Sequence, residues 1–524
     1  MSGEVRPRQA VDSVESGAPG WLAPNRGQEG PTWGNAWLSR RQFAAAAGLS
    51  VAVSGLSACK AFAEATHESK GGPKLVFAHY FPPYPISIDN RPPSEDAYTV
   101  KYLDADGEDG KHAASAGFFR DRPKTQDPLN VKDWEIQNYR TEIRTASSFG
   151  IDGFFVDILA LSGVYFDRVV DLLAAGLAED DAFKFVLQPD MLAQPGEVDP
   201  FRLAKSMDGL IKKFPNLHRD EQGRTVISPV AAEVRPADWW QQFIAALSSL
   251  GQKVVLWPIF IDIGNNLDEY LSQPDYIGAI GEWGARTPEQ VRRRGPMARL
   301  VHEHGKKWIG PVVVQDNRLY NGRFWEAGNT ELLRAHWARA AGEDLGGPVH
   351  GGPDDQPDVV LMVTWNDYSE NTGFAPSVAH GEAFLEISKY FITKYKTGVY
   401  PKPVGDTVCV THRTHRVDAK PVKQDRVMKA SDVDLEPPRD MIEVFALVEK
   451  PCDITVENGS VQEAKALKAG LNIVTAPLGQ GEVSVTLTRE SDPVTRIVSP
   501  AHVRSSIEVQ DLAYHAVLHR SHTR

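Results

Sequence analysis

Residues 359–376 read VVLMVTWNDYSENTGFAP, and this stretch organises our interpretation of the whole chain. Its first part is apolar and β-branched and its end contains Gly and Pro, which is typical of a strand buried on both faces that ends in a turn. Directly after the apolar run stand Trp365, Asn366, Asp367, Tyr368 and Glu370. Aromatic rings stack on sugar faces, and carboxylates and amides bind hydroxyls, so these residues favour a sugar-binding cleft. Two carboxylates three residues apart can also supply a general acid and a base.

A helix N-terminus is the other interpretation of the same residues. Acids in the first turn of a helix interact favourably with its dipole, and the aromatic residues would then fill the core. The segment alone leaves both interpretations open.

Seven further apolar runs precede this one and alternate with segments of helical period. The runs predict strands at 74–83, 151–159, 183–191, 224–233, 252–262, 276–283 and 307–316. The periodic segments predict helices at 134–149, 166–178, 201–214, 238–250, 288–304, 330–342 and, after the eighth strand, 381–395. Eight strands alternating with helices are the pattern of a (β/α)8 TIM barrel. An open doubly wound sheet is the alternative, which the absence of GxGxxG and GxxxxGK[ST] motifs disfavours.

A barrel makes a sharp prediction about the ends of these strands. Its active site lies where the strands end, so acids and aromatic residues are expected to collect there. The residues at these ends are His79, Tyr80, Asp157, Asp190, Glu233, Asp262, Glu282, Trp283, Asp316, Asp367 and Glu370. Acids follow seven of the eight predicted strands. This clustering favours a functional cleft over a set of solvated loops.

Composition and motifs exclude several classes of protein. The 524 residues are 42% hydrophobic and carry a net charge of −12, which argues against a nucleic-acid partner. The three cysteines form no CxxC pair, and no HExxH or GxSxG motif occurs. Only His79 is a histidine at a strand end, so a metal-dependent barrel hydrolase is the least favoured enzyme class. We expect no metal and no cofactor.

The first 66 residues resemble an export signal after a disordered n-region. Residues 39–43 read SRRQF, and a short run rich in small residues follows, which is similar to a twin-arginine signal. Residues 56–59, LSAC, resemble a lipoprotein box with Cys59 as the lipidated residue. The predicted location is periplasmic, membrane-anchored or extracellular. The alternatives are a chance arginine pair before an Ala-rich helix, and a true start further downstream.

The C-terminal part of the chain changes in texture. With the barrel at 70–400, we interpret 401–440 as a linker and 441–524 as a β-sandwich, because short alternating runs with turn signals replace the helices. Cys409 and Cys452 either form a disulfide or stay unpaired. Several histidines are expected at the surface rather than on a metal: His412, His415, His515, His519 and His522.

The barrel part resembles glycoside hydrolase family 71, the α-1,3-glucanases or mutanases. The matching pieces are FAHY at 77–80, Trp134 followed by GIDGF at 150–154, FKF at 183–185 with Asp190-Met191, and above all TWNDYSE at 364–370. The resemblance implies a (β/α)8 barrel with a β-sandwich and endo-hydrolysis of α-1,3-glucan with inversion. It implies Asp367 and Glu370 as the catalytic pair. The export signal would make this chain a bacterial exported member.

Some residues depart from the family pattern, which leaves the substrate open. Ser369 stands where the family has Gly, and NTGF at 371–374 replaces the family's usual residues. The eighth-strand motif also resembles that of the endo-α-mannanase-type barrels of family 99. A glycan-binding lipoprotein that does not cut its ligand is the competing class.

Together these patterns predict a monomeric glycoside hydrolase with a polysaccharide or oligosaccharide as its substrate. Glu370 is expected to act as the acid and Asp367 as the base, with crowding by other acids raising a pKa. Substrate-binding residues are expected to be His79, Tyr80, Asp157, Asp190, Glu233, Glu282, Trp283, Trp365, Asn366 and Tyr368.

Overall fold

The computed structural model describes residues 73–264, 267–273, 276–346, 352–431, 437–490 and 492–521. The predicted export signal with Cys59 lies outside the described residues, and so does His522. Across these ranges no helix combines the length and the apolar character that a membrane span needs.

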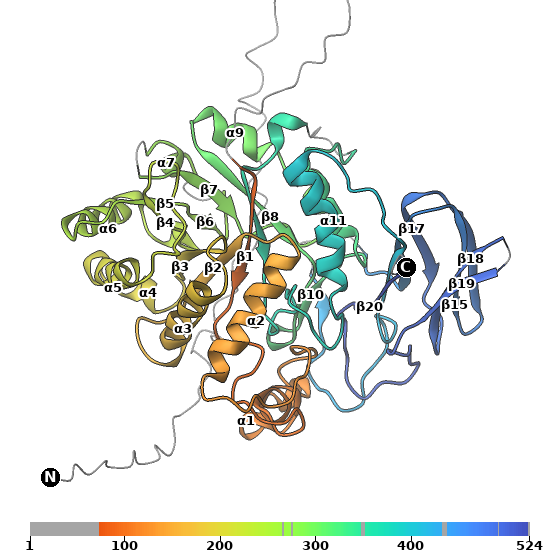
Figure 1. Ribbon diagram of the computed structural model, residues 1–524. Helices are drawn as coiled ribbons and strands as arrows, with labels where there is room; N and C mark the ends of the chain where they lie inside the picture. Colours follow the sequence, from red (N-terminus) through yellow and green to blue (C-terminus); the bar gives the residue numbers. More distant parts are fainter. Residues whose placement is uncertain are drawn as a thin grey trace, which may run out of the picture.

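A parallel sheet of nine strands forms the centre of the first part of the chain (Figure 1). Its order is β5-β4-β3-β2-β1-β11-β8-β7-β6. The strands are β1 (Leu75–Tyr80), β2 (Gly153–Ile158), β3 (Lys184–Pro189), β4 (Thr225–Ile227), β5 (Val254–Leu256), β6 (Ile259–Phe260), β7 (Ala279–Glu282), β8 (Lys307–Val313) and β11 (Val359–Val363). Each neighbouring pair runs parallel. The prediction of an α/β fold with parallel strands is therefore confirmed.

The two end strands of this sheet, β5 and β6, are separated by only Trp257 and Pro258. The predicted fifth strand is split there, because proline has no N–H to donate to a neighbouring strand. Single parallel bridges join Val230 to Ile259 and Leu256 to Ile277. Thus both halves of the split strand contact the chain on either side of them.

Helices surround this sheet at the places where the sequence predicts them (Figure 1). They are α2 (Trp134–Ser148), α3 (Val164–Glu179), α5 (Pro200–Lys213), α6 (Ala237–Ser249), α8 (Pro288–Arg293), α9 (Met297–Glu303), α10 (Glu331–Ala340) and α11 (Ala383–Thr397). The helix predicted at 288–304 is wrong as one element. It breaks into α8 and α9 at Gly295-Pro296, since proline removes a helical hydrogen bond.

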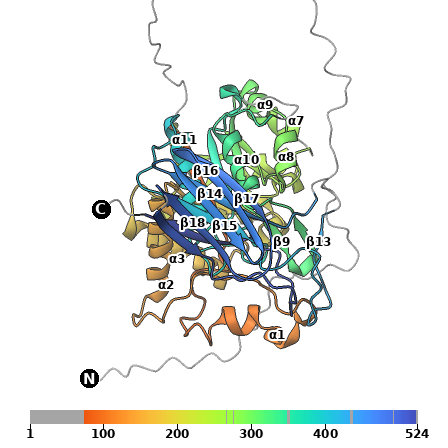
Figure 2. The same cartoon turned by 90° about the vertical axis from the view of Figure 1, so that its right-hand side faces the viewer.

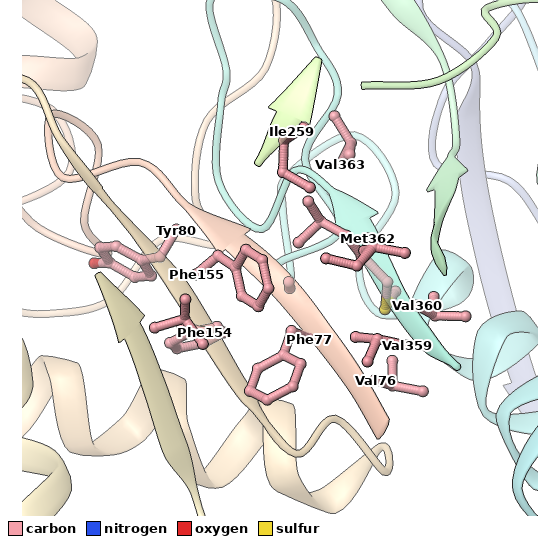
Figure 3. Close-up of a cluster of buried hydrophobic side chains, with 14 of the residues drawn as sticks. Val76, Phe77, Tyr80, Phe154, Phe155, Ile259, Val359, Val360, Met362 and Val363 are labelled. Atoms are coloured by element: carbon pink, nitrogen blue, oxygen red, sulfur yellow. The ribbon is translucent and has the colours of Figure 1, made fainter. Parts of the chain in front are cut away.

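Side chains along β1 and β2 alternate between two packed faces, as the pleat of a strand requires. One face carries Phe77 and Phe155, whose ring centroids lie 5.1 Å apart, and is called the inner face (Figure 3). The opposite, outer face carries Tyr80 and Phe154, whose ring centroids lie 5.2 Å apart. Both faces are buried, so the strands read as continuous apolar runs. This alternation decides on which face the side chain of each strand-end residue lies.

Residues 81–133, between β1 and α2, contain a second cluster of buried rings. Phe81, Tyr84, Tyr98, Phe118 and Phe119 pack together there. Tyr368 joins this cluster, with ring centroids 6.1 Å from Tyr98 and 6.4 Å from Phe119. The segment is therefore a packed support beneath the loop that follows β11.

The last part of the chain forms two four-stranded antiparallel sheets with an apolar core between them (Figure 2). One has the order β17-β14-β12-β20 and the other β16-β15-β18-β19. Their strands are β12 (Thr407–His412), β14 (Met441–Val448), β15 (Cys452–Asn458), β16 (Val461–Leu467), β17 (Gly470–Pro477), β18 (Val483–Arg489), β19 (Asp492–Val498) and β20 (His515–Arg520).

The structure changes several details predicted for this part. The linker interpretation of 401–440 is wrong for β12, which pairs with both β14 and β20. Residues 505–510 lie within the predicted β-sandwich but form no strand, and Ile507 makes only an isolated bridge to Pro421. Cys409 and Cys452 are both free and buried. His412 and His415 are not surface residues, because they are 0% and 1% exposed in the core of this region. The remaining domain boundaries stay predictions.

A small third sheet joins the two parts. It has the order β13-β10-β9, with β9 (Asp316–Arg318), β10 (Arg323–Trp325) and β13 (Lys429–Ala430). β9 and β10 form an antiparallel hairpin just after β8, and β13 pairs with β10 from the C-terminal side. The hairpin thus ties the C-terminal part of the chain to the end of the parallel sheet.

Candidate active site

The inner face of β1, β2 and β3 ends in three polar side chains, and His79 contacts the other two, Gln188 and Asp157. His79 donates from Nδ1 to Oε1 of Gln188 at 2.6 Å, and its Nε2 lies 3.8 Å from Oδ2 of Asp157. All three are buried. Burial lowers the pKa of His79 to about 4, so its ring is neutral near pH 7.

Asp190 adds a second buried carboxyl group, next to that of Asp157, to this face. Burial, then the charges of Asp190 and Asp367, hold the pKa of Asp157 well above its usual range. Burial raises the pKa of Asp190 to about 6, while the Leu192 N–H that donates to it at 2.8 Å acts in the other direction. Such clustered acids with raised pKa values are typical of a catalytic site.

Asp367 lies in the loop after β11, and its Oδ1 accepts three hydrogen bonds. The donors are the Ser369 N–H at 2.9 Å, the Ser369 hydroxyl at 2.6 Å and the Glu370 N–H at 3.2 Å. Burial raises the pKa of this carboxyl, and the three donors act against that rise because they stabilise its ionised form. The carboxyl is therefore fixed in orientation.

Glu370 lies on the same loop and faces a different set of groups. The Tyr320 hydroxyl donates to its Oε1 at 3.0 Å, and Nη2 of Arg318 lies 3.0 Å from its Oε2. Burial raises the pKa of Glu370 to about 7, Asp316 and Asp367 add to that rise, and Arg318 opposes it. A carboxyl with such a pKa is half protonated at neutral pH and can act as a general acid.

Trp283 and its neighbour Glu282 point in opposite directions at the end of β7. The half-buried Trp283 ring meets the His79 ring edge-on with centroids 4.8 Å apart. Glu282 pairs instead with Arg294, which lies between α8 and α9. The prediction of Glu282 as a substrate-binding residue is therefore wrong, since the strand turns its side chain toward the helices.

Tyr80 and Trp365 are also buried on the outer face. The Tyr80 hydroxyl donates to Oε2 of Glu142 at 2.8 Å, and the Trp365 indole donates to Oε1 of the same residue at 3.2 Å. They are 1% and 0% exposed. Their prediction as sugar-binding walls is wrong, because α2 covers this face.

Three further predicted residues support the loops rather than line the acid cluster. Asn366 accepts from the Phe81 N–H at 2.7 Å and donates to the carbonyls of Phe81 and Tyr84. Tyr368 packs in the ring cluster of residues 81–119. Glu233 accepts from the N–H groups of Ile261 and Asp262 at 2.8 Å each. The structure thus brings together six of the predicted residues: His79, Asp157, Asp190, Trp283, Asp367 and Glu370.

Sequence reasoning missed Gln188, Arg318 and Tyr320. Gln188 could have been found from strand alternation, because it lies two residues before Asp190 on the same face of the third strand. Arg318 and Tyr320 follow the seventh strand in a stretch with no motif, and only the fold brings them to Glu370. In the described ranges no group of three or more His, Cys, Asp and Glu residues is arranged to hold a metal ion.

Comparisons with known proteins show what this chain is similar to. Residues 129–516 match the model of glycosyl hydrolase family 71. The curated protein "Glucan endo-1,3-alpha-glucosidase agn1" of Schizosaccharomyces pombe is 21% identical over 424 residues, which covers 74% of this chain and 92% of that protein.

Solved structures of other glycosidases are more distant. The GH99 endo-α-mannosidase from Bacteroides thetaiotaomicron is 13% identical, with a TM-score of 0.45 over 61% of this chain and 97% of its own. A family 2 glycosyl hydrolase from Bacteroides cellulosilyticus is 10% identical, with a TM-score of 0.36 over 69% of this chain and 43% of its own. Both TM-scores lie below 0.5, so these likenesses add no argument of their own.

Proposed function

The chain belongs to glycosyl hydrolase family 71 and is a glycoside hydrolase, and on that premise we propose that it is an endo-acting α-1,3-glucanase. The observation that carries the proposal is the pair of carboxyls after β11: Oδ1 of Asp367 accepts three hydrogen bonds, whereas Glu370 lies against Arg318 and Tyr320. The name of the fission-yeast relative supports α-1,3-glucan as the substrate. Membership in a hydrolase family favours an enzyme over a protein that only binds glycan.

In the proposed mechanism Glu370 is the general acid. It donates a proton to the oxygen of the glycosidic bond as the bond to the sugar breaks. Its pKa of about 7 keeps a large protonated fraction at neutral pH and below.

Asp367 is the proposed general base. It takes a proton from a water molecule that attacks the sugar on the face opposite the leaving group, which inverts the configuration. An inverting enzyme needs the two carboxyls about 6.5–9.5 Å apart to leave room for this water. The three donors on Oδ1 keep Asp367 oriented and favour its ionised form. His79, Asp157, Asp190 and Trp283 would bind the sugar next to the pair.

The finer architecture is part of the same proposal. The parallel strands form a closed (β/α)8 barrel in which β5 and β6 are two halves of one strand, and the antiparallel sheets form a β-sandwich. Support comes from the bridges of Val230 to Ile259 and Leu256 to Ile277, which link the split strand to both of its neighbours. In a barrel the carboxyl ends of all strands face one mouth, as the proposed site requires.

Cell location is a separate proposal that rests on the sequence. The arginine pair at 40–41 and LSAC at 56–59 support twin-arginine export and lipidation of Cys59, and we expect a monomer. Radioactive palmitate incorporation that disappears in Cys59→Ser would support the anchor, whereas equal labelling of both forms would contradict it. Size-exclusion chromatography with light scattering tests the monomer.

Hydrolysis of a panel of α-glucans and α-mannans tests the enzymatic proposal. We expect reducing-sugar release from α-1,3-glucan, and a loss of about 10³-fold or more in Asp367→Asn and Glu370→Gln, because each amide keeps the shape but cannot exchange the proton. Glu233→Gln is the matched control, since its side-chain oxygen can still accept the N–H groups of Ile261 and Asp262.

Product analysis separates the outcomes. The β-anomer as the first product in ¹H NMR supports inversion, and long oligosaccharides before glucose support endo action. Release from α-mannan alone would move the substrate class to mannan. Full activity in both carboxyl variants would refute the catalytic pair.

A further inference from the structure

We propose that Arg318 is a positioning residue for the carboxyl group of Glu370, and that Asp316 and Arg286 hold Arg318 in place. This inference rests on the proposed role of Glu370 as the general acid. It assigns a function to a buried charge network, Arg318, Asp316 and Arg286, that plays no part in the mechanism above.

Arg318 contacts the carboxyl group of Glu370 directly. Nη2 of Arg318 lies 3.0 Å from Oε2 of Glu370, and the Tyr320 hydroxyl donates to Oε1 at 3.0 Å. Both carboxyl oxygens therefore have a partner from the same three-residue segment. The side chains of Arg318 and Glu370 are only 19% and 16% exposed, so water competes little for these contacts.

Asp316 holds the guanidinium group of Arg318 in place. Its Nε and Nη2 donate to the two oxygens of Asp316 at 2.8 and 2.7 Å, a fork that sets the plane of the guanidinium group. Asp316 is fully buried and also accepts from Nε of Arg286 at 2.7 Å. Arg286 in turn donates to the carbonyls of Trp283 and Gly284. The network thus runs from the end of β7 through β9 to the loop after β11.

The residues next to Arg318 and Glu370 are also hydrogen-bonded to each other. The Asn317 N–H donates to the Glu370 carbonyl at 2.8 Å, and Asn371 donates from Nδ2 to the Asn317 carbonyl at 3.1 Å. These two bonds connect the main chain of β9 to the loop after β11. The guanidinium of Arg318 also lies 5.2 Å over the Trp325 ring of β10. A flexible side chain would not be held by this many independent contacts.

The C-terminal part of the chain braces this hairpin. β13 pairs with β10, and the Tyr514 N–H donates to Gln315 at 3.0 Å, directly before β9. The side chains of Leu319 and Phe324 pack with Met428 and Leu512 of the C-terminal part. Residues more than a hundred positions away in the sequence therefore fix the segment that contacts the acid.

The charges that face Glu370 come from three places. Arg318, Asp316 and Tyr320 belong to the β9 segment, Arg286 follows β7, and Asp367 lies on its own loop. Arg318 favours the ionised carboxyl and Asp316 disfavours it. Removing the cation would raise the affinity of Glu370 for its proton, whereas neutralising Asp316 would lower it.

The test is the pH profile of kcat/KM and kcat for purified full-chain variants on α-1,3-glucan. We expect Arg318→Met to lower kcat about 10- to 100-fold and to move the alkaline limb upward by about one pH unit. Tyr320→Phe is expected to move it less in the same direction, because one donor to the carboxyl is lost. Asp316→Asn is expected to move it downward.

Controls separate positioning from a general loss of structure. Arg323→Met removes an exposed arginine from the same hairpin and should leave the profile unchanged. Arg318→Lys keeps the charge but not the fork, so it should restore part of the lost kcat. Disruption of the fold would not shift the alkaline limb in opposite directions for Arg318→Met and Asp316→Asn.

Each outcome decides the inference. An unchanged kcat and pH profile in Arg318→Met and Tyr320→Phe would overturn it. Should Arg318→Met or Asp316→Asn not fold, Arg318→Lys and Tyr320→Phe give the answer, and normal profiles in both would again overturn it. Full activity in Glu370→Gln refutes the proposed acid instead, so the two failures are distinguishable.

Discussion

Two regions of this molecule bury charged side chains, and they treat them differently. Where the antiparallel sheets meet the first part of the chain, opposite charges pair closely: Arg413 lies 3.1 Å from Glu326, and Arg334 lies 3.1 Å from Glu443. At the carboxyl edge of the parallel sheet, Asp157 and Asp190 instead lie near each other, and burial raises the pKa of both.

The close ion pairs of the first region stabilise the fold, whereas the neighbouring carboxyl groups of the second cost stability and serve the proposed chemistry. Glu443 accepts from the N–H and hydroxyl of Thr330 at the start of α10, so the C-terminal part caps a helix of the first part. At the acid cluster, Oδ1 of Asp157 and Nε2 of Gln188 are buried without a hydrogen-bond partner among the described residues. Unsatisfied buried polar groups cost stability, which is expected where a substrate supplies the missing partners.

Breaking the paired region should give the largest effect on stability. Arg413→Met would leave Glu326 without its cation in a buried place, and we expect the free energy of unfolding to fall by about 3–5 kcal/mol. Chemical denaturation measures this change. Arg416→Met, whose side chain is 59% exposed, is the matched control and should cost about 0–1 kcal/mol. Equal costs for the two variants would contradict the distinction.

Relieving the crowded region should have the opposite sign. The pKa of Asp190 rises from 3.8 to about 6 on folding, so its ionisation opposes folding as the pH increases from about 4 to 6. Asp190→Asn removes this opposition, and we expect a gain of about 1–3 kcal/mol at pH 7 that disappears below about pH 4. Denaturation at both pH values measures it, with exposed Asp453→Asn as the control. A loss of stability at pH 7 would refute the assignment.

A smaller effect separates the two aromatic residues that the sequence presents as equals. Trp283→Ala should raise KM about fivefold with little change in stability, because the half-buried ring is available to a sugar. Trp365→Phe should leave KM unchanged and lower the melting temperature, since the indole bond to Glu142 is lost. Steady-state kinetics and calorimetry on both variants would show the reverse pattern if the inner and outer faces were misassigned.

The smallest expected effect concerns Ser369, one of the residues that depart from the family pattern. Ser369→Ala removes one of three donors to Asp367, which should raise the pKa of that carboxyl. Since the base must be ionised, the acid limb of the kcat/KM profile should move upward by about half a pH unit. Ser506→Ala, at an exposed position, is the control. A downward shift would show that the hydroxyl does not favour the ionised carboxyl.

The positions of the strands and helices followed from the sequence because each depends on nearby residues. Eight apolar runs predicted the positions of the nine strands of the parallel sheet, and helical periodicity predicted the helices around them. Proline altered this picture twice, by splitting a strand at Pro258 and a helix at Pro296. β16 has no apolar alternation that would predict it, because five of its seven residues are exposed and its apolar residues are mostly alanines at exposed positions or the two end residues.

The site was predicted only in part for a related reason. Acids after strands marked the correct edge of the sheet, and Asp157, Asp190, Asp367 and Glu370 all lie there. Position in the sequence does not distinguish neighbouring residues such as Glu282 and Trp283, although a pleated strand sends them to opposite faces.

By itself, the sequence of this protein determined the parallel α/β class, the edge that carries the acids and the motif that links the chain to its family. These properties are local or additive along the chain. Only the tertiary structure decided which polar groups meet: Glu142 with Tyr80 and Trp365, Arg294 with Glu282, and Arg318 with Glu370. The physical reason is that the pKa and exposure of a buried side chain depend on atoms from distant segments, which no local pattern records.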